Sequence, residues 1–249
     1  MRFDNKIAIV TGGLSGIGAA IATRLAAEGA KVVAADIATD AAALDAASPI
    51  APLRVDVADP ASAAELVETT RATHGRVDIL VQAAGIGHDV PLLETTPELF
   101  DRIIAINLRG TFLVAQAAAR AMVAQGGGAI VNIASVSGMR GNVGRTAYGA
   151  SKGGVVIMSQ VMAVELATAG VRVNVIAPGP VDTPLVARMH DAEIRRIWTD
   201  AVPMRRYATP EEIAGAAAFL CSEDAGYVTG HVLAVDGGFL GTGVQRRPQ

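Results

Sequence analysis

Short runs of β-branched residues alternate along the chain with longer, alanine-rich stretches that have helical periodicity. The short runs have the length and composition of buried strands, and the stretches between them are long enough for helices. We expect strands at 6–10, 31–35, 53–57, 77–81, 129–134, 171–177 and 231–235. Regular strand–helix alternation with right-handed crossovers predicts an α/β fold, a Rossmann-type doubly wound parallel sheet of about seven strands with helices on both faces.

The helical stretches also carry start and stop signals. Asp59-Pro60 is a good helix start, with Asp as the N-cap and Pro at the first helical position, and Gly29 suits a helix end. We expect helices at 16–28, 40–47, 59–74, 97–124, 146–168, 185–199 and 210–221, the second being short and weak. The helix at 97–124 is expected to break near Asn107. No long linker interrupts the chain, so we expect one domain over 1–249, with a substrate lid at about 184–207.

Composition and charge exclude several classes of protein. Hydrophobic residues make up 51% and charged residues 18%, which excludes disorder, and a net charge of −3 gives no footprint for nucleic acid. The single cysteine, Cys221, fits a reducing compartment. No targeting segment or membrane span is visible, so we expect a cytoplasmic protein. The four histidines share no metal-ligand spacing, and no metal site is expected.

A glycine-rich segment, Thr11 to Gly18, lies between the first strand and the first helix. Glycines at 12, 16 and 18 let the backbone turn tightly and approach a pyrophosphate, which the free N–H groups of the helix start would bind. A plain strand–helix turn is the alternative. The Walker loop is excluded because no Gly-Lys-Ser/Thr follows.

Two acidic residues end the second and third predicted strands. Asp36 follows Gly18 by eighteen residues, which is about where a carboxylate binds the adenosine ribose and repels the 2′-phosphate of NADP. We therefore expect NAD as the cofactor. Asp56-Val57 would reach the adenine. Either aspartate could instead be a solvated residue of a turn.

Tyr148 and Lys152 are four residues apart near the start of a predicted helix, so they share one face. A tyrosine has a pKa of about 10, and a nearby ammonium group lowers that value by stabilising the phenolate. Lys152 and a positively charged nicotinamide would share that task. Ser135 ends the fifth strand, Asn107 lies in the preceding helix, and Pro178-Gly179 ends the sixth strand. Strand ends of this kind meet at the carboxyl edge of the sheet, where open α/β sheets bind ligands.

With these motifs the chain resembles the short-chain dehydrogenase/reductase family, from about Lys6 to Gly238. The resemblance implies that Tyr148 is the general acid/base, Ser135 holds the substrate oxygen, and Lys152 binds the nicotinamide ribose. It also implies that Asn107 holds a water in a proton relay and that Thr183 contacts the carboxamide. Asn107 could instead cap a helix bend, and Ser135 could be a turn residue. The implied cofactor contacts are Gly12, Ser15, Gly16, Ile17, Gly18, Asp36, Asp56, Val57, Ala84, Gly85, Tyr148, Lys152, Pro178, Gly179, Val181 and Thr183.

One departure from the family pattern follows the fourth strand. The family usually has Asn-Asn-Ala-Gly, whereas this chain has Gln82-Ala83-Ala84-Gly85. Ala84-Gly85 keep the close backbone approach to the cofactor. We expect the change to remove side-chain hydrogen bonds that brace the central sheet and to leave the chemistry intact.

Substrate contacts are expected from three loops, at 86–90, 136–145 and 185–207, because loops tolerate change. Met189, Ile194 and Trp198 have roughly helical spacing and suit the inner face of a lid, or else a packed satellite helix. Polar contacts could come from His88, Asn142, Arg145 and His190. No strong anion clamp is evident, which favours a neutral secondary alcohol, polyol, sugar or cyclic diol as substrate.

The stretch 153–166 is apolar nearly all round, which suggests a subunit interface. The family resemblance implies a homotetramer, with this helix and the preceding one forming one interface. Two further functions stay open. An NADPH-dependent 3-oxoacyl-[acyl-carrier-protein] reductase would need positive charge near Asp36 and a basic docking surface, to which Arg102 and Arg109 could contribute. A non-catalytic dinucleotide-sensing module would not need Ser135, Tyr148 and Lys152 together.

Overall fold

The computed structural model describes residues 1–41, 45 and 47–243 and contains one parallel sheet of seven strands in the order β3-β2-β1-β4-β5-β6-β7. The order reverses between β1 and β4, as in a doubly wound sheet, and confirms the predicted fold class. The strands are β1 (Ile7–Thr11), β2 (Lys31–Asp36), β3 (Ile50–Arg54), β4 (Ile79–Gln82), β5 (Gly128–Ile133), β6 (Val171–Pro178) and β7 (Val232–Val235).

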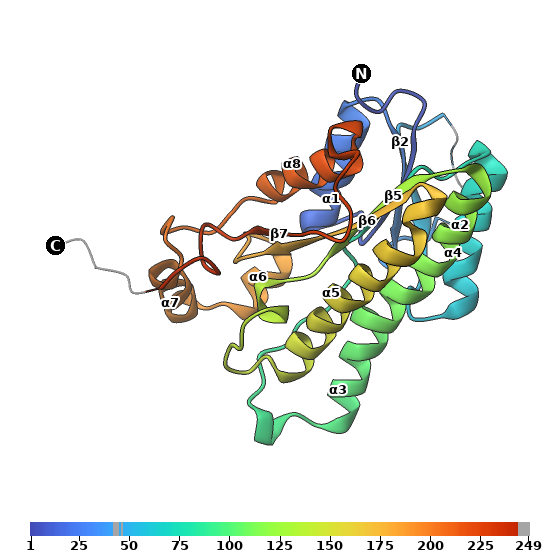
Figure 1. Ribbon diagram of the computed structural model, residues 1–249. Helices are drawn as coiled ribbons and strands as arrows, with labels where there is room; N and C mark the ends of the chain where they lie inside the picture. The colour runs from blue at the N-terminus through green and yellow to red at the C-terminus, as the bar shows by residue number, and fades with distance from the viewer. Residues whose placement is uncertain (42–44, 46, 244–249) are drawn as a thin grey trace.

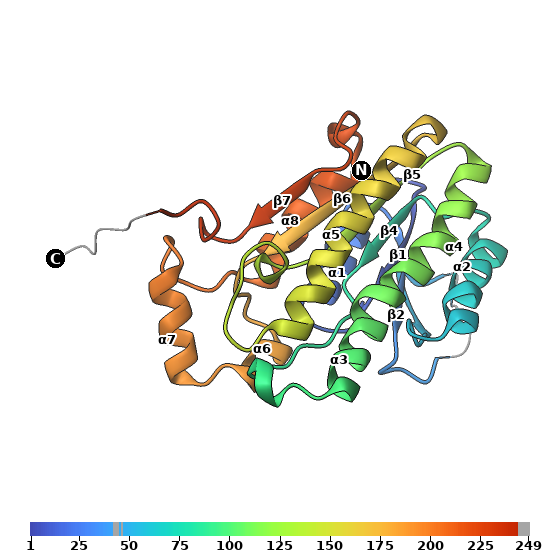
Figure 2. The same ribbon diagram turned by 60° about the horizontal axis from the view of Figure 1, so that its bottom comes forward.

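Helices cover both faces of the sheet (Figures 1 and 2). Successive residues of a strand point to opposite faces, so Ala8 and Val10 pack with α1 and α8, whereas Ile9 packs with α2 and α4. No helix of the described chain has the length and apolar character needed to cross a membrane. The helices are α1 (Gly16–Ala27), α2 (Pro60–His74), α3 (Pro97–Ile104), α4 (Gly110–Gln125), α5 (Thr146–Leu166), α6 (Pro184–Met189), α7 (Ala192–Ala201) and α8 (Pro210–Cys221).

The break expected near Asn107 is a π-helical turn, Ala105–Arg109, that joins α3 to α4 without interrupting the helix. The Thr111 hydroxyl donates to the Asn107 carbonyl oxygen at 2.7 Å. A π-turn inserts an extra residue and frequently marks a functional site. Here it places the Asn107 side chain in the interior, beside the loop that follows β4.

Two predicted elements differ from the structure, and a third is not tested by it. Strand β3 lies three residues earlier than predicted, because Pro52 is tolerated on an edge strand and the alternating pattern of Leu53 and Val55 continues beyond the ladder. The predicted helix at 185–199 is two helices, separated at His190 and Asp191. The predicted helix at 40–47 falls largely on residues 42–44 and 46, which lie outside the described part of the chain.

The interior amide bonds that the departure at Gln82 was expected to remove are present. The Gln82 side-chain amide donates to the Thr111 carbonyl oxygen and to Asn132 Oδ1, both at 3.0 Å. Asn132 in turn donates to Ser159 Oγ at 2.8 Å. The longer glutamine therefore ties β4 to β5, α4 and α5, and the expected loss of bracing was wrong.

We predict that Gln82→Leu lowers the free energy of unfolding by about 2–3 kcal/mol, because it leaves Asn132 Oδ1 buried without its donor and removes the side-chain bond to the Thr111 carbonyl oxygen. Denaturant unfolding of wild type and variant measures the difference. Glu65→Leu, on the exposed face of α2, is the control and should change stability by no more than about 0.5 kcal/mol. Equal stability of Gln82→Leu and wild type would contradict the bracing role.

Candidate active site

Three adjoining cavities follow the carboxyl edge of the sheet. The largest, about 390 Å³, is lined by the loop after β1 and by the ends of β2 and β4. It shares Gly85 and Thr183 with a cavity of about 120 Å³, which in turn shares Ser135 and Tyr148 with one of about 70 Å³. All predicted cofactor contacts line the first two cavities. They are Gly12, Ser15, Gly16, Ile17, Gly18, Asp36, Asp56, Val57, Ala84, Gly85, Tyr148, Lys152, Pro178, Gly179, Val181 and Thr183.

The backbone of the glycine loop is packed too closely for side chains at Gly12 and Gly18. A Cβ on Gly18 would lie 2.1 Å from the Gly12 carbonyl oxygen, and one on Gly12 would lie 2.8 Å from the Ala84 nitrogen. Gly12 and Gly16 both have positive φ. Ser15, the N-cap of α1, makes no capping bond with its side chain, so the helix start keeps N–H groups for an anion. This loop fits the pyrophosphate of a dinucleotide.

Asp36 lies at the far end of the large cavity, at the end of β2. Its carboxylate accepts hydrogen bonds from the backbone N–H groups of Leu14 and Ala38, at 3.3 and 3.0 Å. Arg54 is the register partner of Asp36, but its guanidinium donates to the Ile37 carbonyl oxygen at 2.8 Å and does not line the cavity. The carboxylate therefore faces the cavity from a fixed position.

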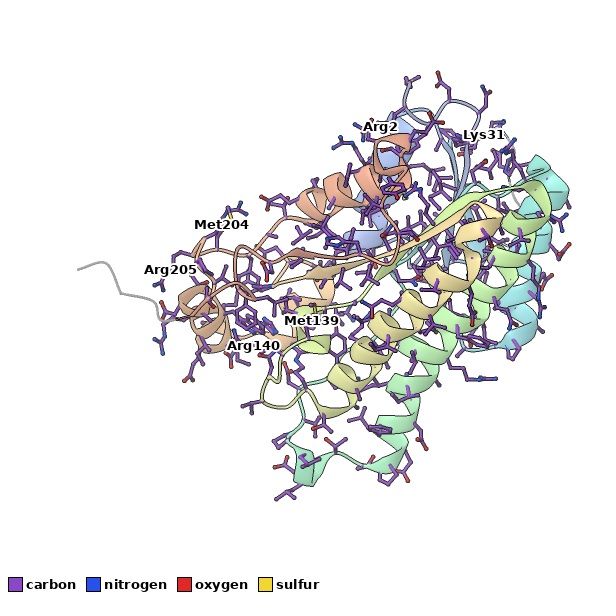
Figure 3. All side chains as sticks on the ribbon, in the orientation of Figure 1. Arg2, Lys31, Met139, Arg140, Met204 and Arg205 are labelled. Carbon is purple, nitrogen blue, oxygen red and sulfur yellow. The ribbon has the colours of Figure 1, made fainter. Side chains whose placement is uncertain are left out.

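Two other basic residues, Lys31 and Arg188, differ in their position relative to this cavity. Lys31 begins β2 and lies at the end of the sheet opposite Met139 and Arg140 (Figure 3). Arg188 lines the cavity from α6, although no sequence motif pointed to it. Its Nε donates to the Pro184 carbonyl oxygen at 3.2 Å.

Tyr148 and Lys152 come together with Ser135 in the middle cavity, as their spacing predicts. One turn of α5 separates the first two, and Lys152 Nζ lies 5.8 Å from the centroid of the Tyr148 ring. Lys152 is buried, and its ammonium donates to the Ile133 carbonyl oxygen at 2.7 Å. Ser135 follows β5 and accepts a bond from the Ser137 N–H at 3.1 Å, which orients its side chain.

Burial dominates the protonation of this group. It raises the pKa of Tyr148, with the charge of Arg145 and a hydrogen bond to Ser135 acting in the opposite direction. Burial lowers the pKa of Lys152 to about 8. Within the chain alone the Tyr148 pKa is thus shifted upward, opposite to the shift that the Tyr148–Lys152 spacing predicts, because both groups are removed from water together.

Asn107 lies beside these residues, and its side chain binds the backbone of Ile86. Its Oδ1 accepts from the Ile86 N–H and its Nδ2 donates to the Ile86 carbonyl oxygen, both at 2.9 Å. A Cβ on Gly85 would lie 3.1 Å from Asn107 Oδ1 and 3.6 Å from Lys152 Nζ, so the three residues meet at one point. The π-turn that carries Asn107 therefore fixes the loop after β4.

The smallest cavity, beyond Tyr148, is enclosed by parts of all three loops that the sequence assigned to the substrate. Gly87 comes from the first, Arg145 from the second, and Met189 and Trp198 from the third. Ile194 does not line it, and neither do His88 and Asn142. Two residues that sequence reasoning missed, Asp89 and Tyr207, bond to Arg145 and His190 of the cavity wall.

Another cavity, of about 370 Å³ and so close in volume to the largest one, lies at the opposite, amino edge of the sheet. It contains no predicted site residue. Its arginines are engaged within the chain, Arg76 with the Asp78 carboxylate and Arg172 with the carbonyl oxygens of Leu220 and Ser222. The predicted cofactor and catalytic residues Ser135, Tyr148 and Lys152 line the cavities at the carboxyl edge instead.

The known proteins to which the chain is similar are reductases and dehydrogenases. Residues 12–240 match the family described as enoyl-(acyl carrier protein) reductase. The chain is 39% identical to a 3-oxoacyl-[acyl-carrier-protein] reductase of Thermotoga maritima, with 96% of this chain and 100% of the relative covered. It is 43% identical to cis-4-hydroxycyclohexanecarboxylate dehydrogenase of Sinomonas cyclohexanicum, covering 95% and 97%. The crystal structure of levodione reductase superimposes with a TM-score of 0.88 at 37% identity, covering 95% and 98%.

We predict that the free energy of unfolding of wild type, relative to that of Lys152→Met, increases as the pH rises from 8 to 10.5. Below pH 8 the folded and unfolded chains both carry the ammonium, and the folded chain bears the whole cost of burying it. Above pH 8 the folded chain has released that proton while the unfolded chain, with a pKa of 10.5, still holds it, so rising pH stabilises the folded state.

The change should approach about 3 kcal/mol over that range. Denaturant unfolding of both proteins below pH 8 and again towards pH 10.5 measures it. The comparison with Lys152→Met removes the contribution of other titrating groups. A difference that stays constant with pH would contradict the depressed pKa.

Proposed function

Because this chain belongs to the short-chain dehydrogenase/reductase family and is an oxidoreductase for alcohol and keto groups, we propose that it transfers a hydride between NAD(H) and a small secondary alcohol or ketone. The observation that carries this proposal is the convergence of Ser135, Tyr148 and Lys152 in a cavity continuous with the glycine loop. A dinucleotide-sensing module would have no use for that triad.

The choice of NAD over NADP rests on Asp36. Its carboxylate would accept bonds from both ribose hydroxyls and would repel a 2′-phosphate. Arg54, the nearest cation in register, donates to backbone carbonyls instead. The alternative is an NADPH-dependent 3-oxoacyl-[acyl-carrier-protein] reductase, which the name of one relative favours. One observation counts against this alternative. Arg109, a candidate for the basic docking surface, donates to the Ala58 carbonyl oxygen within the chain.

In the proposed reaction the residues of the chain handle the proton. The bound nicotinamide supplies the acceptor of the hydride from the carbinol carbon. Ser135 donates to the substrate oxygen, and the Tyr148 phenolate takes the hydroxyl proton as the C–H and O–H bonds break and the C=O bond forms. Lys152 binds the nicotinamide ribose and, together with the positive charge of the oxidised cofactor, opposes the upward shift that burial gives the Tyr148 pKa. Asn107 positions the relay through which the proton leaves.

The substrate is proposed from the cavity beyond Tyr148. Its volume of about 70 Å³ and its apolar lid residues, Leu185, Met189 and Trp198, favour a small molecule over a long acyl chain. A simple secondary alcohol, a cyclic diol, a small polyol or a sugar belongs to this class. The segment 184–207 supplies the lid, and one relative is named for a cyclic alcohol.

We also propose that the enzyme is a homotetramer. The isolated chain leaves an apolar stripe of α5 exposed, with Ile157, Val161 and Val164 showing 63%, 50% and 80% of their surface. On α4, Phe112 and Val123 are exposed as well. Exposed apolar patches of this kind favour an interface between copies of the chain.

We predict that Tyr148→Phe retains dinucleotide binding and loses at least about 10³-fold in kcat, because proton transfer loses its positioned base while the ring still fills the site. Steady-state kinetics on a secondary alcohol and titration of NADH fluorescence measure the two properties. Tyr227→Phe is the matched control, since Tyr227 is fully exposed and outside the cavities, and should behave as wild type. A near-normal kcat for Tyr148→Phe would refute the assignment.

We predict that wild type prefers NAD by roughly 10²-fold or more in kcat/KM, since like charges in contact cost several kcal/mol. Asp36→Ala should gain activity with NADP and lose activity with NAD. Asp101→Ala, which removes an exposed carboxylate of α3, should leave the ratio unchanged. Equal use of both cofactors by wild type, or no gain with NADP in Asp36→Ala, would show that Asp36 does not set the choice.

A further inference from the structure

The polar wall of the substrate cavity is built around one guanidinium group. Arg145 ends the loop before α5, its side chain is only 9% exposed, and it lines the cavity together with Ser135 and Tyr148. Its Cζ lies 5.1 Å from the centroid of the Tyr148 ring. Its charge is close enough to lower the pKa of Tyr148 against the larger effect of burial. A positively charged group therefore lies over the ring of Tyr148.

Two of the three guanidinium nitrogens are already engaged. Nη2 donates to Asp89 Oδ2 at 3.2 Å, and Nε forms an ion pair with Asp89 Oδ1 at 2.5 Å. Nη2 also lies 3.3 Å from His190 Nε2, which must accept because a guanidinium has no lone pair to offer. His190 Nδ1 then carries the hydrogen and donates to the Tyr207 hydroxyl at 2.9 Å. This chain of bonds fixes the plane of the guanidinium.

The third nitrogen, Nη1, has no hydrogen-bond partner among the described residues. Every buried side-chain nitrogen of these residues does have a partner. Nη1 is therefore accessible, and it faces Gly87, which also lines the cavity. A Cβ on Gly87 would lie 3.5 Å from Nη1. The missing side chain leaves room for a substrate group to approach the two N–H donors of this nitrogen.

Asp89 does not cancel the attraction that this edge offers to an anion. Asp89 binds the Nε–Nη2 edge, whereas a ligand on Nη1 touches the cation directly, and Coulomb energy falls with distance. The Asp89 side chain is 30% exposed, more than that of Arg145, so water screens it better. Burial, followed by the charge of Arg145, lowers the pKa of His190, which keeps that ring neutral.

We propose that Arg145 Nη1 binds a carboxylate of the substrate, so that the enzyme acts on small hydroxycarboxylic acids and the corresponding oxo acids. This proposal rests on the proposed function of the same site and narrows it. The carboxylate lies near the carbinol carbon, because Arg145 and Tyr148 line one small cavity, and the hydrocarbon part packs on Leu185, Met189 and Trp198 of the lid. The proposal departs from the neutral substrate that the sequence led us to expect, because the sequence did not show where Arg145 points.

The first test compares acids with their neutral isosteres. 3-Hydroxybutyrate and 4-hydroxycyclohexanecarboxylate are each assayed against the corresponding primary amide, with NAD and with NADP. Wild type should prefer the acid of at least one pair by about tenfold or more in kcat/KM, the effect of one charge-assisted bond. Arg145→Gln should reduce that ratio to about one, and the ratio cancels any general effect on Tyr148.

Two further variants separate charge from shape. Gly87→Ala keeps the cation but places a methyl group over Nη1, and it should also reduce the preference for the acid. Arg140→Gln removes a neighbouring arginine that does not line the cavity and should keep the preference. Equal turnover of acid and amide by wild type, or an acid preference that survives in both Arg145→Gln and Gly87→Ala, would overturn the proposal.

A binding measurement tests the carboxylate site independently of turnover. Calorimetry with cyclohexanecarboxylate and cyclohexanecarboxamide, in the presence of NADH, should show at least about tenfold tighter binding of the carboxylate to wild type, lost in Gly87→Ala. Equal affinities would overturn the carboxylate site. If carboxylate binding is selective but no alcohol is oxidised with either dinucleotide, the proposed function fails and the anion site stands. If only neutral alcohols are oxidised, the function stands and the anion site fails.

Discussion

The contact between three backbone segments at Gly12 is the constraint on which the rest of the site depends. The loop after β1, the start of α1 and the turn after β4 meet there, with no room for a side chain on Gly12 or Gly18. Because backbone atoms touch backbone atoms, the start of α1 is held at the carboxyl edge of the sheet with its N–H groups pointing into the large cavity. The end of β4 is fixed in the same step, and with it the loop that Asn107 holds through Ile86.

Burial and positive charge oppose each other around Tyr148. Removing the phenol from water raises its pKa, and the same burial lowers that of Lys152, so each group alone would favour its neutral form. Arg145 offsets part of this cost without losing its own charge, because a guanidinium stays protonated. The site thus keeps one permanent cation near the reacting oxygen and one amine whose protonation responds to its surroundings.

Hydrogen bonds that lie behind these groups explain why they hold their positions. Gln82, Asn132 and Ser159 join β4, β5 and α5 through the interior, directly beneath the strand ends that carry the site. On the substrate side, Asp89, His190 and Tyr207 orient Arg145 and join the first loop to the lid segment. Both networks are polar, and no buried side-chain nitrogen or oxygen of the described residues lacks a hydrogen-bond partner, which favours one defined arrangement over several.

The sequence by itself determined the fold class, nearly all strands and helices, and the set of residues around the cofactor cavities. It did so because strand periodicity, glycine spacing and the Tyr148–Lys152 interval are local properties, and parallel strands bring their carboxyl ends together by topology. Tertiary structure alone decided that Gln82 braces the interior, that Arg54 bonds to carbonyl oxygens near Asp36, and that Arg145 lines the cavity beyond Tyr148. These depend on side-chain directions and on partners distant in sequence, such as Asp89 and His190, and no local pattern encodes them.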